Sequence, residues 1–305
     1  MTGSLLKEKL ERGEFAVTAE IGPPKSASGE DILARAKMIK GCADAYNITD
    51  NQTATVRLSS LAGSVFIMKE GMEPILQMTC RDRNRIALQS DVLGANALGI
   101  RNILCLSGDH QCFGNQPDTK NVYDVDSTQE IMIFKRMRDE GTLWSGDRLK
   151  VAPDLYLGAV SNPFGDPREM HVMRLRNKVS AGAQFIQTQS VFDLDAFESW
   201  VSEVRRDVSL KDVKILAGML PLRTLKAARY MAESVPGTCV PPEIVRRMAA
   251  APDEEKEGQR IASEILDGIR DMKGVSGVHI MPVNWYSAVR PLLERAGLLT
   301  GHSLR

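Results

Sequence analysis

The chain has 305 residues, of which 43% are hydrophobic and 26% charged, and this composition is typical of a globular protein with a sizeable core. Its 39 Lys and Arg residues balance its 39 Asp and Glu residues, which excludes the strong basic field that nucleic-acid binding requires. The apolar runs are far shorter than the roughly 20 residues of a membrane-spanning helix, and the start does not resemble a signal peptide, so we expect a cytoplasmic protein that binds neither nucleic acid nor membrane.

Short apolar runs alternate with longer stretches of helical periodicity, which is the pattern of repeated strand–helix units and a parallel sheet. The runs predicted as strands are 15–21, 45–49, 74–79, 102–106, 154–159, 185–189, 213–219 and 277–282. The helical stretches between them are 29–39, 57–69, 83–98, 129–140, 168–181, 194–207 and 224–234. An insertion over 236–275 begins with a Pro- and Gly-containing region and continues as a charged amphipathic helix over 253–273, and a final helix is predicted over 287–298.

This order of elements predicts an α/β fold, a single (β/α)8 TIM barrel over residues 1–305 with a helical insertion before the eighth strand. No low-complexity linker divides the sequence into two halves. An open, doubly wound sheet is the alternative fold, because a sequence pattern does not reveal whether a sheet closes.

Polar side chains stand at the predicted carboxyl end of every strand, where barrel enzymes place their chemistry. These residues are Glu20, Thr49 with Asp50 and Asn51, Gln77 with Thr79, Asp109, Ser161 with Asn162, Gln189, Arg223 and Asn284. We therefore expect an enzyme that acts on a small molecule at this end of the barrel.

Glu20 is the best candidate for a general acid. It ends an apolar strand just before a rigid Pro-Pro pair, and a partly desolvated carboxyl has the raised pKa that proton donation near neutral pH needs. The structural alternative is an ion pair with a Lys or Arg of the barrel. Asp109 follows Gly108, which lets a ligand approach the backbone closely, although Asp109 is equally suited to a turn or a helix cap.

Basic residues near the end of the predicted helix 168–181 have two interpretations. Lys178 is suited to bind a phosphate, but a basic last turn also complements the helix dipole, and His171 is equally ambiguous. The five cysteines and four histidines lack the spacing of metal sites, so no metal is expected.

Six segments, taken in order, resemble the methylenetetrahydrofolate reductase family. They are Ala-Glu-Ile-Gly-Pro-Pro-Lys (19–25), Gln-Met-Thr-Cys (77–80), Leu-Ser-Gly-Asp (106–109), Lys-Val-Ser-Ala-Gly-Ala (178–183), Thr-Gln-Ser-Val-Phe-Asp (188–193) and Ala-Gly-Met-Leu-Pro-Leu (217–222). Each segment is weak alone, but their order and spacing match the family over nearly the whole chain.

The resemblance implies a barrel that binds a non-covalent flavin, usually FAD, and reduces 5,10-methylenetetrahydrofolate to 5-methyltetrahydrofolate in one-carbon metabolism. It implies that Glu20 is the acid that opens the methylene bridge, that Asp109 stabilises the resulting cation beside flavin and folate, and that Gln189 binds the pterin. The residues that match flavin contacts of the family are Thr49, Gln77, Leu106, Ser107, Gly108, Asp109, Gly158, Val160, Phe164, His171 and Lys178.

Several positions depart from the family pattern. Many relatives have His, Arg, Tyr and Asp where this chain has Gln77, Ser107, Val160 and His171, and an Arg that contacts substrate is replaced by Trp285. These changes affect the adenine end of the cofactor site, which makes FMN the alternative to FAD.

The loop 108–114 and the segment 121–127 look most like the short anaerobic and acetogen-type reductases, which often work with an iron–sulfur partner subunit. The resemblance therefore implies that electrons come from NADH or from such a partner, and that the chain forms a homo- or hetero-oligomer. Two other functions stay open. One is a methyltransferase that passes a folate methyl group to a corrinoid protein, and the other is a folate-binding scaffold subunit of a redox complex.

Overall fold

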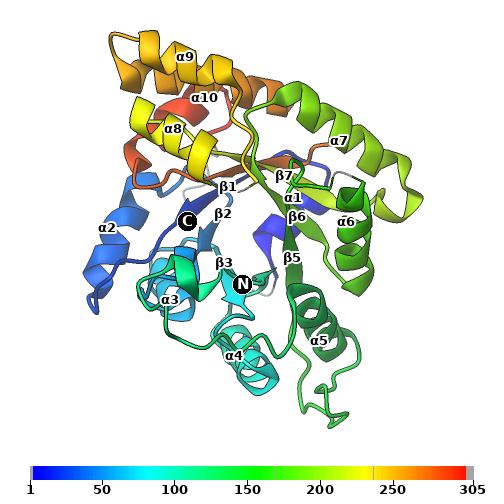
Figure 1. Cartoon of the computed structure of the whole chain (residues 1–305). Coiled ribbons are helices and arrows are strands. Elements are labelled where there is room, and N and C mark those ends of the chain that lie inside the picture. Colours follow the sequence, from blue (N-terminus) through cyan, green and yellow to red (C-terminus); the bar gives the residue numbers. More distant parts are fainter. Residues whose placement is uncertain (1–2, 168, 236, 300–305) are drawn as a thin grey trace.

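The computed structural model describes residues 3–167, 169–235 and 237–299. Within these residues, eight parallel strands form a closed barrel in chain order, and pairing of β1 with β8 closes it (Figure 1). The strands are β1 (Ala16–Ile21), β2 (Ala45–Ile48), β3 (Pro74–Thr79), β4 (Asn102–Leu106), β5 (Tyr156–Ser161), β6 (Phe185–Ser190), β7 (Lys214–Met219) and β8 (Gly277–Ile280). The predicted TIM barrel is confirmed, and the open sheet is excluded.

The described helices lie around the barrel and at its two ends, and those around it bury their apolar faces against the outer side of the strands (Figure 1). They are α1 (Leu5–Glu11), α2 (Gly29–Ile39), α3 (Ser60–Lys69), α4 (Arg85–Ala97), α5 (Ser127–Asp139), α6 (Met170–Ala181), α7 (Leu194–Arg206), α8 (Leu225–Ser234), α9 (Pro242–Ala250), α10 (Glu254–Asp271) and α11 (Val289–Arg295). None of the described helices is long and apolar enough to cross a bilayer.

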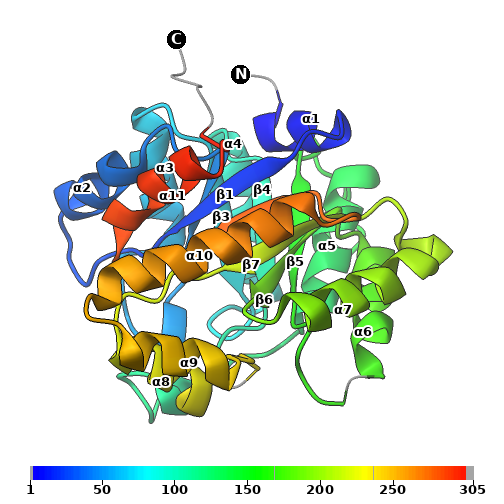
Figure 2. The ribbon, with the colours of Figure 1, turned by 90° about the horizontal axis from the view of Figure 1, so that it is seen from above.

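A smaller apolar cluster fills the amino-terminal part of the barrel. Its aromatic pair, Tyr156 and Phe185, stacks with ring centroids 5.0 Å apart. Gly158 makes room for this pair, since a Cβ at that position would lie 2.2 Å from the Phe185 ring. Leu6 and Leu10 of α1 belong to the same cluster and cover this end, whereas α8 and α9 lie at the opposite end (Figure 2).

The predicted helices differ from the structure in four places. The sequence analysis missed α1, and it predicted one helix in the insertion where the structure has α9 and α10. The final helix is split into the 3-10 turn η4 (Tyr286–Ala288) and α11. The helix predicted from residue 168 begins at Met170, and residue 168 itself lies outside the described residues.

Candidate active site

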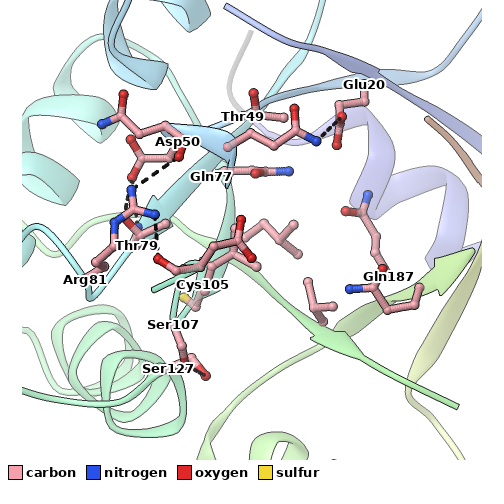
Figure 3. A pocket seen from close by; sticks show the side chains of 18 of the residues that line it. Glu20, Thr49, Asp50, Gln77, Thr79, Arg81, Cys105, Ser107, Ser127 and Gln187 are labelled. Carbon is pink, nitrogen blue, oxygen red and sulfur yellow. Dashed lines mark hydrogen bonds between the residues drawn. The ribbon is translucent and has the colours of Figure 1, made fainter. Parts of the chain in front are cut away.

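A cavity of about 410 Å³ opens at the carboxyl-terminal end of the strands, which we call the mouth of the barrel (Figure 3). It is lined by Glu20, Thr49, Asp50, Asn51, Gln52, Gln77, Thr79, Arg81, Leu104, Cys105, Leu106, Ser107, Gly108, Asp109, Ser127, Val160, Asn162, Lys178, Gln187, Thr188, Gln189, His279 and Met281. A volume of this size is in the range of small-molecule sites. The prediction that polar residues converge at this end is confirmed for most strands.

Glu20, near the end of β1, is buried in the wall of this cavity with 8% of its surface exposed. Burial raises the pKa of its carboxyl to about 7, and a hydrogen bond from Gln52 Nε2 to Oε1, 3.3 Å long, opposes this shift only in part. The predicted alternative was an ion pair with Lys or Arg, and no Lys or Arg among the described residues pairs with Glu20. Glu20 therefore exchanges its proton near neutral pH and faces the cavity (Figure 3).

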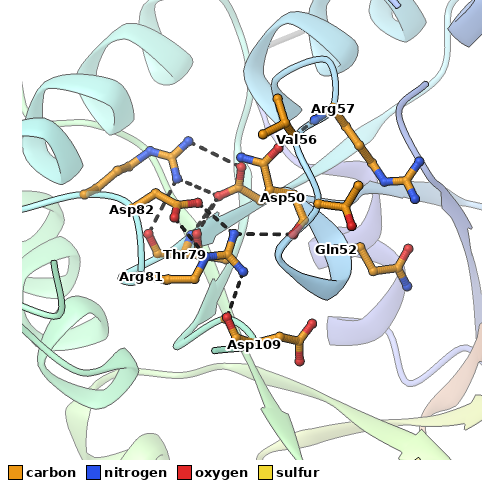
Figure 4. A network of polar contacts seen from close by, with 12 residues as sticks. Asp50, Gln52, Val56, Arg57, Thr79, Arg81, Asp82 and Asp109 are labelled. Atoms are coloured by element: carbon orange, nitrogen blue, oxygen red, sulfur yellow. Dashed lines mark hydrogen bonds and ion pairs between the residues drawn. The ribbon is translucent and has the colours of Figure 1, made fainter. Parts of the chain in front are cut away.

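Asp109 lies in the loop after β4 and is exposed at the mouth. Its side chain accepts a hydrogen bond from the backbone N–H of Thr53 at 2.9 Å, and Arg81 Nη1 donates to its backbone carbonyl at 2.9 Å (Figure 4). Gly108 before it has a φ of +83°, and a Cβ there would crowd Thr79 at 3.2 Å. The Asp109 carboxylate is thus fixed in place by backbone contacts while its second oxygen stays available.

Asp50 forms a buried ionic network beside the cavity. Its Oδ2 atom accepts hydrogen bonds from the backbone N–H and the hydroxyl of Thr79, both at 3.0 Å, and from Arg83 Nη1 at 2.6 Å (Figure 4). These bonds tie the ends of β2 and β3 together. The Asp50 carboxylate therefore holds the loops of the mouth in place.

Thr49, at the end of β2, is the clearest sign that a ligand belongs in the cavity. Its Oγ1 atom is buried and has no hydrogen-bond partner, although a buried hydroxyl without a partner is costly. Gln77 on β3 lies nearby in the lining (Figure 3). A bound molecule with a polar edge would supply hydrogen-bond partners for Thr49 and Gln77.

A second cavity of about 380 Å³ adjoins the first and shares Val160, Asn162 and Lys178 with it. Lys178 Nζ donates a hydrogen bond to the Val160 carbonyl at 2.6 Å, and burial lowers the pKa of Lys178. His171 lines the second cavity, contacts the Gly165 carbonyl through Nε2, and leaves Nδ1 buried without a partner. The second cavity is also lined by Arg174 and by Asp166, so it combines cationic side chains with one carboxylate.

The expected flavin-binding residues divide into three groups. The first cavity is lined by Thr49, Gln77, Leu106, Ser107, Gly108, Asp109, Val160 and Lys178, and the second by His171 together with Val160 and Lys178. Gly158 and Phe164 line neither cavity: Gly158 lies against the Phe185 ring, and Phe164 packs against the core.

A register shift in β6 positions the predicted pterin-binding residue, Gln189. The pairing of β6 with β7 slips between Gln187 and Ser190, and the Gly218 N–H donates a hydrogen bond to Thr188 Oγ1 at 2.9 Å within this bulge. A Cβ on Gly218 would lie 2.3 Å from the Thr188 carbonyl, so the strands approach closely. The bulge leaves Gln189 exposed in the cavity lining, in keeping with the use of bulges beside active sites.

Other predicted mouth residues lie outside both cavities. Arg223 pairs with Glu255 of α10 at 2.8 Å on the surface, and Asn284 occupies a left-handed turn with a φ of +66°. Trp285, at the position where the resemblance implied loss of a substrate-contacting Arg, is buried in the core.

The sequence analysis missed several cavity residues, including Gln52, Arg81, Gln187 and His279. Gln187 and His279 lie within predicted strands, and the two-residue period of a strand cannot be counted from Gln189 back to Gln187, because the register shifts between Gln187 and Ser190. No sequence signal distinguishes His279 from a histidine of the core.

The sequence profile of the methylenetetrahydrofolate reductase family matches residues 5–297 of this chain. The chain is similar to methylenetetrahydrofolate reductase 2 of Schizosaccharomyces pombe, with 24% identity over 97% of this chain and 47% of that protein. It thus spans about half the length of this relative. It is also similar to the 5,10-methylenetetrahydrofolate reductase of Pectobacterium carotovorum, with 24% identity over 90% of this chain and 87% of that protein.

Among solved structures, an uncharacterized protein from Clostridium thermocellum, described as binding two copies of 5-methyl-5,6,7,8-tetrahydrofolic acid, resembles this chain with a TM-score of 0.68. The match covers 96% of this chain and 100% of that protein at 16% sequence identity. At this identity the likeness shows a shared fold.

Proposed function

Because this chain belongs to the methylenetetrahydrofolate reductase family, we propose that it reduces 5,10-methylenetetrahydrofolate to 5-methyltetrahydrofolate with a bound flavin. The observation that carries the proposal is the buried Glu20 in the mouth of the barrel, whose pKa of about 7 suits a general acid. The related fold of a protein described as binding 5-methyl-5,6,7,8-tetrahydrofolic acid supports folate as the substrate class.

The residues of the two cavities fit a flavin. Thr49 Oγ1 and Gln77 offer polar groups to the edge of a flat ring, and Gly108 lets that ring approach the backbone after β4. Lys178 and Arg174 lie along the second cavity, where they would neutralise a phosphate of the cofactor chain. When bound, the flavin supplies the hydride, and the choice between FAD and FMN depends on how far the cofactor extends along the second cavity.

Glu20 would deliver the proton that opens the substrate. Its protonated carboxyl oxygen gives the proton to a nitrogen of the folate methylene bridge, the carbon–nitrogen bond breaks, and the methylene carbon becomes part of a cationic iminium. Burial is what keeps the proton on Glu20 until substrate arrives.

Asp109 would stabilise the cation that this step creates. Its carboxylate is fixed by the Thr53 N–H, so little reorganisation is needed when positive charge develops nearby. Gln189, brought to the cavity by the bulge in β6, would bind the pterin and hold the methylene carbon in line with the hydride donor.

The electrons would reach the flavin from NADH or from an iron–sulfur partner subunit. Mixing the flavin-loaded protein with NADH in a stopped-flow instrument distinguishes these sources. Rapid bleaching of the flavin absorbance supports direct use of NADH, and slow bleaching in an otherwise active protein supports a partner.

The proposed function is tested by the visible spectrum of the purified protein, chromatography of the heat-released cofactor, and a half-reaction. The flavin is reduced chemically under anaerobic conditions and mixed with 5,10-methylenetetrahydrofolate. Reoxidation of the flavin with formation of 5-methyltetrahydrofolate is expected. Arg223→Ala is a matched control, because Arg223 is a polar residue near a strand end that lines neither cavity. A protein that binds neither FAD nor FMN would contradict the proposal and favour the methyltransferase or the scaffold.

A further inference from the structure

Four buried polar side chains lie inside the barrel next to Glu20, and the proposed chemistry does not use them. They are Thr18 on β1, Asn47 on β2, Gln187 on β6 and His279 on β8, and none exposes more than 3% of its surface. Polar groups so deeply buried in a barrel interior are costly unless they bond to one another. Hydrogen bonds join Asn47, Gln187, Thr18 and His279 in that order, and His279 lies beside Glu20.

The first links of this chain are amide bonds. Asn47 Nδ2 donates to Gln187 Oε1 at 2.6 Å, and Gln187 Nε2 donates to Asn47 Oδ1 at 3.0 Å and to Thr18 Oγ1 at 3.3 Å. Both hydrogens of the Gln187 amide are therefore used. Thr18 Oγ1 accepts a hydrogen bond from Gln187, so the hydrogen of the Thr18 hydroxyl can be donated to another partner.

The hydrogen of the Thr18 hydroxyl determines the tautomer of His279. Thr18 Oγ1 lies 3.0 Å from His279 Nδ1 and 3.4 Å from the Val278 carbonyl, and we assign its hydrogen to Nδ1, the nearer of these two acceptors. Burial lowers the pKa of His279 to about 3, which keeps the ring neutral. A neutral ring that accepts at Nδ1 carries its hydrogen on Nε2.

His279 Nε2 lies 4.0 Å from Glu20 Oε2, while Gln52 Nε2 donates to the other carboxyl oxygen, Oε1. The other titratable group that faces Glu20 is Tyr286, after β8, and burial raises its pKa so that it stays neutral. A shift of Glu20 of about 1 Å would bring Oε2 within hydrogen-bond distance of Nε2.

We propose that His279 is a positioning residue for Glu20, whose Nε2–H group, aimed by Thr18, stabilises the Glu20 carboxylate that forms when the acid has given up its proton. The proton goes from Glu20 to the folate nitrogen, Oε2 then accepts a hydrogen bond from Nε2–H, and His279 keeps its own proton throughout. This inference rests on the proposed function for the role of Glu20 as an acid.

The test compares two substitutions of His279 in the flavin-loaded protein. His279→Leu removes the donor, whereas His279→Gln keeps an N–H close to the position of Nε2. Glu20 is followed by carbon-13 NMR of its side-chain carboxyl through a pH titration, with the signal assigned by its loss in Glu20→Gln. We expect the pKa of Glu20 to rise by about one to two units in His279→Leu and to return toward the wild-type value in His279→Gln.

Two further variants make the result specific. Thr18→Val removes the hydroxyl that orients the ring and should shift the Glu20 pKa in the same direction by a smaller amount; it also serves as the test if His279→Leu does not fold. Tyr46→Phe removes a buried hydroxyl that donates to the Ile39 carbonyl at the outer side of β2, and should leave the Glu20 pKa unchanged.

An unchanged Glu20 pKa in folded His279→Leu, or in folded Thr18→Val if His279→Leu does not fold, would overturn the proposal. The titration of Glu20 does not depend on turnover. It therefore tests the interaction between His279 and Glu20 separately from the proposed reduction of folate. If Glu20 shifts as expected but the wild-type protein reduces no folate, the proposed function fails and the interaction between His279 and Glu20 stands.

Discussion

At the amino-terminal end of the barrel, the buried polar groups around Glu73 are paired, whereas at the mouth the described residues leave Thr49 Oγ1 without a partner. Glu73 accepts hydrogen bonds from Ser4 Oγ at 3.1 Å, from Asn102 Nδ2 at 2.7 Å and from the Leu5 N–H at 3.0 Å, which fixes α1 over the strand starts. Lys9 of α1 adds an ion pair with Asp44 at 2.8 Å.

At the mouth, by contrast, Thr49 Oγ1 has no partner and the pKa of Glu20 is raised to about 7. Both ends belong to the same sheet, so the difference comes from what covers them. The amino-terminal end is covered by a helix of the chain itself, and the mouth is shaped for a ligand. Substitutions at the mouth should therefore reduce activity without loss of stability, and substitutions at the other end should reduce stability without loss of activity.

The largest expected effect is that of Glu20→Gln at the mouth. Loss of the general acid should reduce the rate of folate reduction by about 10²–10⁴-fold, while reduction of the flavin by its electron donor proceeds as in the wild type. Stopped-flow absorbance measures the two half-reactions separately: reduction of the flavin by its electron donor, and reduction of folate by the reduced flavin. Folate reduction at the wild-type rate would show that Glu20 is not the acid.

The same variant should unfold less readily at neutral pH. The pKa of Glu20 is higher in the folded chain than in the unfolded chain, so between about pH 4.5 and pH 7 only the unfolded chain loses the proton, and stability falls as pH rises. Removing the carboxyl relieves this cost, and we expect Glu20→Gln to raise the free energy of unfolding at pH 7 by up to about 3 kcal/mol. Urea unfolding of both proteins at pH 4.5 and pH 7 checks the prediction, and no difference at pH 7 would contradict it.

Leu10→Ala at the opposite end should show the reverse pattern. Leu10 is 1% exposed in the apolar cluster that α1 closes, and truncation of such a side chain costs about 2–5 kcal/mol of unfolding free energy. Urea unfolding measures the loss, and turnover of the folded fraction should stay near the wild-type value. A decrease in turnover as large as that of Glu20→Gln would contradict the claim that the amino-terminal end supports stability and the mouth supports activity.

Much of this arrangement is predictable from sequence, because the eight strands have clear apolar runs and Glu20 ends the first of them beside a Pro-Pro pair. The helix α1 was missed because 7 residues give too short a window for helical periodicity, and its stability comes from contacts with Glu73, more than 60 residues away. Helix α9 was missed because Pro241 and Pro242 suggested a loop, although proline is well accepted at the start of a helix.

Local sequence patterns do not predict contacts between residues that lie on different strands of the barrel. His279 approaches Glu20 from a strand more than 250 residues later in the chain, and only closure of the barrel brings them together. Arg223 was expected at the mouth, but Glu255 of the insertion pairs with it on the surface. In both cases the partner comes from another element, whose position the local sequence does not encode.

The smallest expected effect is that of Thr49→Val. Replacing an unpartnered buried hydroxyl with a methyl group should raise the thermal stability of the flavin-free protein slightly, by up to about 1 kcal/mol. If the hydroxyl bonds to the flavin, the same change should weaken flavin binding by about tenfold. Thermal unfolding of the flavin-free protein and fluorescence titration with flavin measure the two effects, and Thr49→Ser is the control that should retain binding. If Thr49→Val binds flavin as tightly as the wild-type protein does, Thr49 does not bind the cofactor.

The central claim, that burial keeps a catalytic proton on Glu20, is tested most directly by the pH dependence of the single-turnover reaction between the reduced protein and 5,10-methylenetetrahydrofolate. The rate should be level at acidic pH and fall as pH rises through about 7, because Glu20 then loses the proton that the reaction needs. Glu20→Gln should lack this decrease. A wild-type rate that increases through pH 7, or a decrease that persists in Glu20→Gln, would contradict the account.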